Sequence, residues 1–263
     1  MPCPISREDH WIETPHGRMF ARRWRPDADV AGHEPIVLFH DSLGCVELWR
    51  DFPEQLAAAT QRDVIAYDRL GFGHSDRYSG GWSADFIRAE AERFFPLLRE
   101  QLDIASFIAF GHSVGGAMAA TCAALYPQAC RALVTESAQA FVEDRTLDGI
   151  RQARDEFAQP GQMARLEKYH GDKAGWVLAA WTETWLSGEF ADWTLERMVP
   201  AVDCPLLVIH GAEDEYGSLV HPQRIAALAA GRRESLILQD CHHVPHREMA
   251  ERVLEAVTRF IGA

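Results

Sequence analysis

One serine in this chain stands in a sequence context typical of a catalytic nucleophile. Residues 111–115 read G-x-S-x-G with Ser113 at the centre, between an apolar run at 107–110 and a helical segment at 114–126. A strand followed at once by a helix predicts a sharp turn that exposes the serine, and the two glycines let neighbouring backbone approach. Amide groups at the start of the helix would face a developing oxyanion. The alternative is an ordinary glycine-rich turn, and the strand-to-helix context favours the nucleophile.

Histidines are concentrated near the C-terminus, where a general base or a metal site could be built. Cys241, His242, His243 and His246 follow one another closely, and thiol and imidazole groups are ligands that zinc accepts. The alternative is one catalytic base flanked by surface histidines. We favour a single base, interpret His242 and His246 as surface residues, and expect neither a metal ion nor a cofactor.

The segments that would position these residues alternate between buried strands and helices. An antiparallel hairpin opens the chain, and later strands are predicted at 36–40, 64–67, 107–110, 132–135, 206–210 and 235–239. Helices are predicted at 48–59, 86–102 (kinked at Pro96), 114–126, 223–230 and 248–261. Continuous apolar runs are typical of strands covered on both faces. Repeated strand–helix units predict an α/β fold with a mostly parallel central sheet and helices on both faces.

One long stretch departs from this alternation. Residues 138–197 show no strand pattern, and helices are predicted at 151–157, 163–169 and 173–186. We interpret residues 138–197 as a helical cap, or lid, inserted into a core formed by residues 1–137 and 198–263. Four tryptophans lie in the cap: Trp176, Trp181, Trp185 and Trp193. They either line a cleft for an apolar or aromatic acyl group or attach the cap to the core.

The composition excludes several classes of function. A net charge of −13 over 263 residues argues against nucleic acid or an anionic membrane surface as a partner. No apolar run is long enough for a transmembrane helix, and the first residues lack the apolar segment of a signal peptide. The six cysteines are scattered, so we expect a reduced, cytoplasmic protein.

Four motifs, in order and at similar spacing, resemble those of the α/β-hydrolase superfamily over nearly the whole chain. Besides the G-x-S-x-G segment, they are HDSLG at 40–44, DRLGFGHS at 68–75, HGAED at 210–214 and HVPHRE at 243–248. The resemblance is to the serine-nucleophile branch, with an esterase-like core and a helical cap. A serine nucleophile argues against the dehalogenase and epoxide-hydrolase branches, which use an aspartate.

The resemblance implies a role for each candidate residue. Ser113 would be the nucleophile, His243 the base, and Asp214 the acid that fixes the tautomer of His243. The backbone N–H groups of Ser42 and Val114 would bind the oxyanion. Of the tryptophans in the cap, three are candidate substrate contacts: Trp176, Trp181 and Trp185.

Other carboxylates compete with Asp214 for the role of the acid. Glu213 and Glu215 flank it in sequence. Glu136 is the strongest rival, because some members of the superfamily take their acid from the end of the preceding strand. Asp214 is favoured, since it follows the apolar run at 206–209 in a short loop where parallel sheets place functional groups.

Asp41 is a departure from the superfamily pattern, which usually has glycine after the histidine of the oxyanion loop. A carboxylate there can hold its own loop by accepting backbone N–H bonds. If it pointed into the pocket, it would oppose an oxyanion and disfavour anionic substrates. We favour the first interpretation.

These observations predict a serine hydrolase that cleaves a carboxylic ester, thioester or lactone of a small apolar acyl substrate through an acyl-enzyme. Two alternatives remain open: a carbon–carbon bond hydrolase of the meta-cleavage type, and a hydrolase-like ligand receptor with little turnover. The expected partner is a small-molecule substrate, without nucleic acid or membrane, and a homodimer is an open assembly state.

Overall fold

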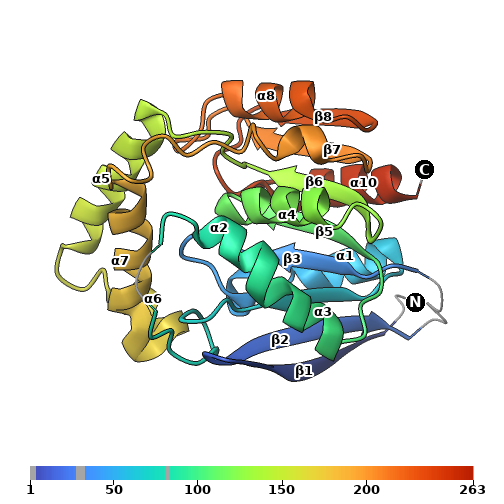
Figure 1. Cartoon of the computed structure of the whole chain (residues 1–263), viewed down its shortest axis with the longest axis horizontal. Helices are drawn as coiled ribbons and strands as arrows, with labels where there is room; N and C mark the ends of the chain where they lie inside the picture. The colour runs from blue at the N-terminus through green and yellow to red at the C-terminus, as the bar shows by residue number, and fades with distance from the viewer. Residues whose placement is uncertain (1–3, 28–32, 81–82, 263) are drawn as a thin grey trace.

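The central sheet has eight strands in the order β1-β2-β4-β3-β5-β6-β7-β8 in the computed structural model, which describes residues 4–27, 33–80 and 83–262 (Figure 1). The strands are β1 (Ile5–Thr14), β2 (Gly17–Pro26), β3 (Ile36–Phe39), β4 (Val64–Tyr67), β5 (Phe107–His112), β6 (Cys130–Glu136), β7 (Leu206–Gly211) and β8 (Arg233–Leu238). β2 pairs antiparallel with β1 and β4, whereas the pairs from β4 through β8 are parallel. The predicted α/β architecture is confirmed.

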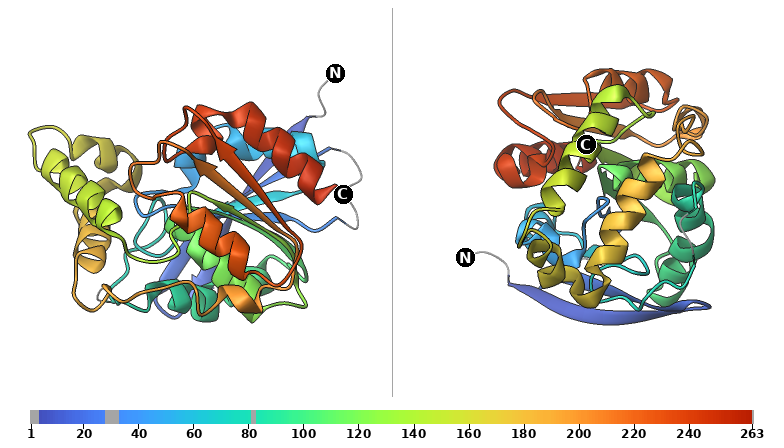
Figure 2. Two further views of the ribbon diagram at one scale, coloured as in Figure 1. Left: turned by 90° about the horizontal axis from the view of Figure 1, so that it is seen from above. Right: turned by 90° about the vertical axis from the view of Figure 1, so that its left-hand side faces the viewer.

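Helices cover both faces of this sheet (Figures 1 and 2). One face carries α2 (Phe86–Ala89), α3 (Phe95–Gln101), α4 (Val114–Leu125) and α8 (Val220–Leu228). The other carries α1 (Phe52–Thr60) and α10 (Ala250–Ile261), and the short α9 (Pro245–Glu248) precedes α10. Within the described residues, three 3-10 turns add to these helices, at Val46–Trp49, Gly171–Lys173 and Val199–Ala201.

The sheet separates two hydrophobic cores, which explains its continuous apolar strands. In β3, Val37 and Phe39 face the core under α3 and α4. Their neighbours Ile36 and Leu38 face the core under α1 and α10. Because successive side chains of a strand point to opposite faces, a strand covered on both sides must be apolar throughout.

Two predicted helices are interrupted where the local backbone requires it. The predicted helix 48–59 is wrong in its start: Arg50 has a φ of 53° and separates a 3-10 turn from α1. The helix expected from 248 is likewise divided, because Met249, with a φ of −135° and a ψ of 48°, is not helical. Pro96, where a kink is predicted, lies in the first turn of α3, which directly follows a π-helical turn at Glu90–Phe94.

Residues 138–197, all of which the structure describes, form no strand of the sheet and contain α5 (Asp144–Phe157), α6 (Ala164–His170) and α7 (Ala174–Trp185). These helices stand together beyond one end of the sheet (Figure 1). The insert leaves the core after β6 and returns before β7. Its two ends meet, because Phe141 and Thr194 form an isolated antiparallel bridge.

None of the helices formed by the described residues combines the length and the apolar character that a bilayer crossing requires. The five cysteines in the described part of the chain are all free and buried: Cys45, Cys122, Cys130, Cys204 and Cys241.

Candidate active site

Ser113 occupies the strained turn that the sequence predicts between β5 and α4. Its φ of 55° and ψ of −126° lie in a region that residues with a side chain rarely adopt. The turn is held by the Ser113 N–H, which donates to the Glu136 carbonyl at 2.8 Å. The residue is 7% exposed, and it lines a cavity. The backbone therefore presents this hydroxyl at the end of the sheet.

The two glycines around Ser113 are required by the packing of α4 on the sheet. A Cβ on Gly115 would lie 2.0 Å from the Phe39 carbonyl oxygen, and one on Gly111 would lie 2.0 Å from the Gly115 carbonyl oxygen. Such separations are far inside van der Waals contact. The two glycines of G-x-S-x-G are thus needed because the start of α4 lies so close to β3 and β5.

His243 and Asp214 are brought together by two separate loops. Nδ1 of His243 lies 2.8 Å and 2.9 Å from the two carboxylate oxygens of Asp214. The carboxylate also accepts the N–H groups of Tyr216 at 2.8 Å and Gly217 at 3.1 Å. Burial opposes the charged form, yet the charge and hydrogen bond of His243 prevail and lower the pKa of Asp214. Of the competing carboxylates, the structure places Asp214 on this ring.

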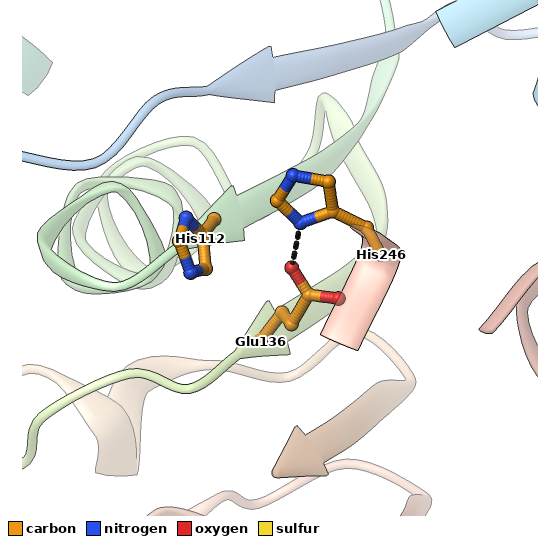
Figure 3. A group of neighbouring side chains, drawn as sticks. All are labelled: His112, Glu136 and His246. Carbon is orange, nitrogen blue, oxygen red and sulfur yellow. Dashed lines mark hydrogen bonds and ion pairs between the residues drawn. The ribbon is translucent and has the colours of Figure 1, made fainter. Parts of the chain in front are cut away.

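Glu136, the strongest rival, pairs with a different histidine. Its carboxylate lies 2.5 Å from Nδ1 of His246, and both side chains are buried (Figure 3). The prediction that His246 lies at the surface is therefore wrong, because the residue fills the core beneath the site next to Trp49, with ring centroids 4.6 Å apart. His242 is exposed as expected and contacts Glu248.

Three side chains in the described residues could by proximity hold a metal ion: His112, Glu136 and His246, whose ligand atoms lie within 4.8 Å of one another (Figure 3). Hydrogen bonds already use this cluster, since His246 bonds Glu136 and Nε2 of His112 lies 2.8 Å from the His243 carbonyl. A cation would have to displace these bonds. The group that the sequence suggested, residues 241–246, is not brought together as a ligand set.

The loop expected to carry the oxyanion site follows β3 and lies beside the nucleophile. Ser42 and Ser113 line the same cavity. Asp41 Oδ1 accepts the Leu43 N–H at 3.1 Å, and its backbone carbonyl accepts a bond from buried Arg69 at 2.9 Å. The predicted tie within the loop is therefore present. Asp41 also lines the cavity of Ser113.

Two adjoining cavities surround this arrangement. The one at Ser113 has a volume of about 180 Å³ and its neighbour about 140 Å³. Trp181 and Trp185 line both, as does Ser42, whereas Trp176 lines only the second. Trp193 instead stacks on Phe190 with ring centroids 5.3 Å apart. The insert therefore contributes aromatic walls to the space next to the nucleophile.

Comparison with known proteins agrees with this geometry. A family model described as the alpha/beta hydrolase fold matches residues 34–160. Serine hydrolase BPHL of Mus musculus is 27% identical over 243 residues, which cover 88% of this chain and 80% of the relative; the Homo sapiens protein gives the same values. Residues 34–160 therefore match the α/β-hydrolase family, and the chain has the α/β-hydrolase fold. Its similarity to serine hydrolases supports a hydrolase.

Solved structures of this superfamily share the fold over almost the whole chain. Proline iminopeptidase of Mycobacterium smegmatis superposes with a TM-score of 0.74 at 20% identity, covering 97% of this chain and 98% of its own. A meta-cleavage product hydrolase of Pseudomonas fluorescens IP01 gives a TM-score of 0.74 at 19% identity, covering 96% and 97%. At these identities the likeness concerns the fold.

Some residues of this α/β hydrolase that the sequence did not single out also shape its site. The Tyr216 ring packs edge-on against His243, with centroids 4.8 Å apart. His170, from α6, accepts the Gly73 N–H at 2.9 Å and donates to the Leu43 carbonyl at 3.0 Å. Lys173 donates to the Gly73 carbonyl at 2.7 Å. The position of Tyr216, two residues after Asp214, was the one available signal.

A buried carboxyl forms part of the second cavity. Glu90, in the π-helical turn, accepts a hydrogen bond from the Tyr67 hydroxyl at 2.9 Å. Burial raises the pKa of Glu90 to about 7, and the charge of Arg69 opposes that shift only in part. At neutral pH this carboxyl is therefore close to its midpoint.

We predict that Glu90→Gln stabilises the protein at pH 8 relative to the parent and that this advantage disappears by pH 4.5. The usual pKa of 4.5 is raised to about 7 on folding, so the folded state binds more protons between these values and stability falls as the pH rises. Glutamine retains an acceptor for Tyr67. The free energy of unfolding, measured by urea denaturation across this range, tests the prediction. Glu100→Gln, an exposed change on α3, is the control, and parallel curves for both variants would contradict the prediction.

Proposed function

We propose that this protein is a serine hydrolase that cleaves an ester, thioester or lactone of a small apolar acyl group. Ser113 Oγ attacks the carbonyl carbon while His243 takes its proton. The C–O or C–S bond to the leaving group then breaks, and His243 returns the proton to that group. A water molecule, deprotonated by His243, then attacks the acyl carbon, the bond to Ser113 Oγ breaks, and His243 returns the proton to Oγ as the acid leaves.

One observation carries the proposal: a strained serine at a helix start and a histidine buried against a carboxylate open into one cavity. An isolated exposed serine would not need a left-handed turn, and a histidine that only packs in the core, such as His246, does not line the cavity of that serine. With Asp214 on Nδ1, that nitrogen carries the hydrogen, and Nε2 is left as the base. Backbone N–H groups of Ser42 and Val114 supply the oxyanion site in this proposal.

The helical insert acts in the same proposal as a lid that selects the acyl group. Trp181 and Trp185 form a wall shared by both cavities, and Trp176 extends it. Covering one aromatic face with an apolar chain contributes roughly 1–3 kcal/mol, at about 25 cal/mol per Å² of buried apolar area. Such a wall supports apolar acyl chains over acetyl.

Ser113→Ala should abolish hydrolysis of an activated ester while the protein stays folded. Loss of the nucleophile in such a triad costs on the order of 10⁶ in kcat. Hydrolysis of p-nitrophenyl esters, labelling by a fluorophosphonate probe and thermal unfolding are measured together, with the exposed Ser235→Ala as the control. Parent-like activity in folded Ser113→Ala would refute the nucleophile. A folded parent protein that neither labels nor hydrolyses would favour a ligand receptor.

Asp214→Asn and Glu136→Gln should differ sharply in their effect on kcat. The first leaves the ring in the wrong tautomer and should cost roughly 10⁴ in kcat. The second disturbs His246, which does not touch the reacting atoms in our proposal, so Glu136→Gln should lower kcat much less. Steady-state kinetics on one ester decide between them. An inactive Glu136→Gln beside an active Asp214→Asn would reverse the assignment.

Trp181→Ala should reduce selectivity for long or aromatic acyl chains over acetyl by roughly tenfold in kcat/KM, equivalent to about 1.4 kcal/mol. Parallel changes at Trp176 and Trp185 test the rest of the wall. Trp193→Ala is the matched control, because Trp193 lines neither cavity. A series of p-nitrophenyl esters gives the chain-length profile. An unchanged profile in all four variants, with stability alone reduced, would show that these tryptophans only pack.

A further inference from the structure

Asp41 introduces a carboxylate where an anion is unfavourable for the proposed reaction. It stands next to Ser42 and lines the cavity of Ser113. Oδ1 accepts a hydrogen bond from the Leu43 N–H at 3.1 Å, and the partner of Oδ2 remains to be identified. An uncompensated negative charge here would oppose the developing oxyanion.

The partner of Oδ2 is the residue immediately before the nucleophile. Nδ1 of His112 lies 3.5 Å from Asp41 Oδ2, and its Nε2 lies 2.8 Å from the carbonyl oxygen of His243. His112 is 2% exposed. One side chain therefore links the oxyanion loop, the nucleophile turn and the loop of the base.

Both ring nitrogens of His112 face oxygen atoms, and this favours a protonated ring. Nε2 must carry a hydrogen to bond the carbonyl, so a neutral ring would turn the lone pair of Nδ1 toward a carboxylate. Only the doubly protonated ring satisfies both contacts. His170 provides the contrast, because it lies between an N–H donor and a carbonyl acceptor and is satisfied as a neutral ring.

The groups around His112 favour its cationic form. Two carboxylates, Asp41 and Glu136, face it, together with the rings of His243 and His246 at centroid distances of 5.1 Å and 5.0 Å. Burial alone would lower the pKa of His112, but the hydrogen bond to Asp41 and the charges of both carboxylates raise it to about 9. The same contact lowers the pKa of Asp41 against the effect of burial.

We propose that His112 is a positioning residue, present as an imidazolium, that neutralises and holds Asp41 away from the oxyanion site while its Nε2–H fixes the backbone of His243. The inference rests on the proposed function for its effect on catalysis. It accounts for the exchange of glycine for aspartate in the oxyanion loop, because a carboxylate at this position is harmless only beside a fixed cation. His112 and Asp41 then act as one unit.

A double-mutant comparison tests this unit. His112→Gln keeps a donor for the His243 carbonyl but loses the charge, and it should lower kcat on the order of 10²-fold with little change in KM. Asp41→Asn removes the charge that needs compensation. The double variant His112→Gln/Asp41→Asn should therefore recover most of the loss. His16→Gln, in the exposed β1–β2 turn, is the matched control. Additive losses in the double variant would overturn the proposal.

The pH profile supplies a second readout that packing alone would not change. Because the imidazolium is present below about pH 9 and lost above it, kcat of the parent should fall on the alkaline side, and Asp41→Asn should abolish that fall. An alkaline limb unchanged in Asp41→Asn would contradict the proposal.

NMR titration of the His112 ring in folded Ser113→Ala separates this inference from the proposed function, since it needs no turnover. The His112 pKa should lie near 9 and move toward 6.5 when Asp41→Asn is added, whereas the ring of His170 should remain neutral at pH 7. A normal His112 pKa would refute the cation even if the protein is a hydrolase. A raised pKa in a protein without hydrolytic activity would refute only the function.

Discussion

The first turn of α4 lies so close to β3 and β5 that neither Gly111 nor Gly115 has room for a side chain. That approach forces the chain at Ser113 through a left-handed turn, with a φ of 55°. The energetic cost of the turn is borne by the parallel sheet, whose buried strands allow the backbone no alternative path. The position of the serine hydroxyl is thus a property of the whole core, and the other groups of the site are arranged around a fixed point.

Polar contacts from distant segments then fix the loops that surround this point. Arg69 holds the loop after β3 through the Asp41 carbonyl, and His170 and Lys173 connect the insert to the loops beside it. Each of these side chains is buried and bonded to backbone oxygen atoms. Buried polar groups without partners are costly, so their bonds specify one arrangement of loops that apolar packing alone would leave variable.

Sequence patterns predicted the parts of this structure that depend on local periodicity. The strands from β3 onward and the helices α4 and α10 follow from apolar runs and helical spacing, and the turn at Ser113 follows from its glycines. Contacts between side chains far apart in the sequence could not be predicted from these patterns. Glu136 and His246 are 110 residues apart, and nothing local to either indicates that the other will cover it. The helical spacing of apolar residues also does not indicate where a helix is interrupted, as it is at Arg50.

The bridge between Phe141 and Thr194 brings both ends of the helical insert to one place on the core, where the Leu195 N–H also donates to the Ala140 carbonyl at 2.8 Å. The chain therefore leaves the core and re-enters it at neighbouring positions, whatever the length of the insert between them. The entropy of closing a loop grows only slowly with its length, so evolution could lengthen, shorten or replace this segment at small thermodynamic expense. Substrate preference and catalytic machinery would then diversify separately within one chain.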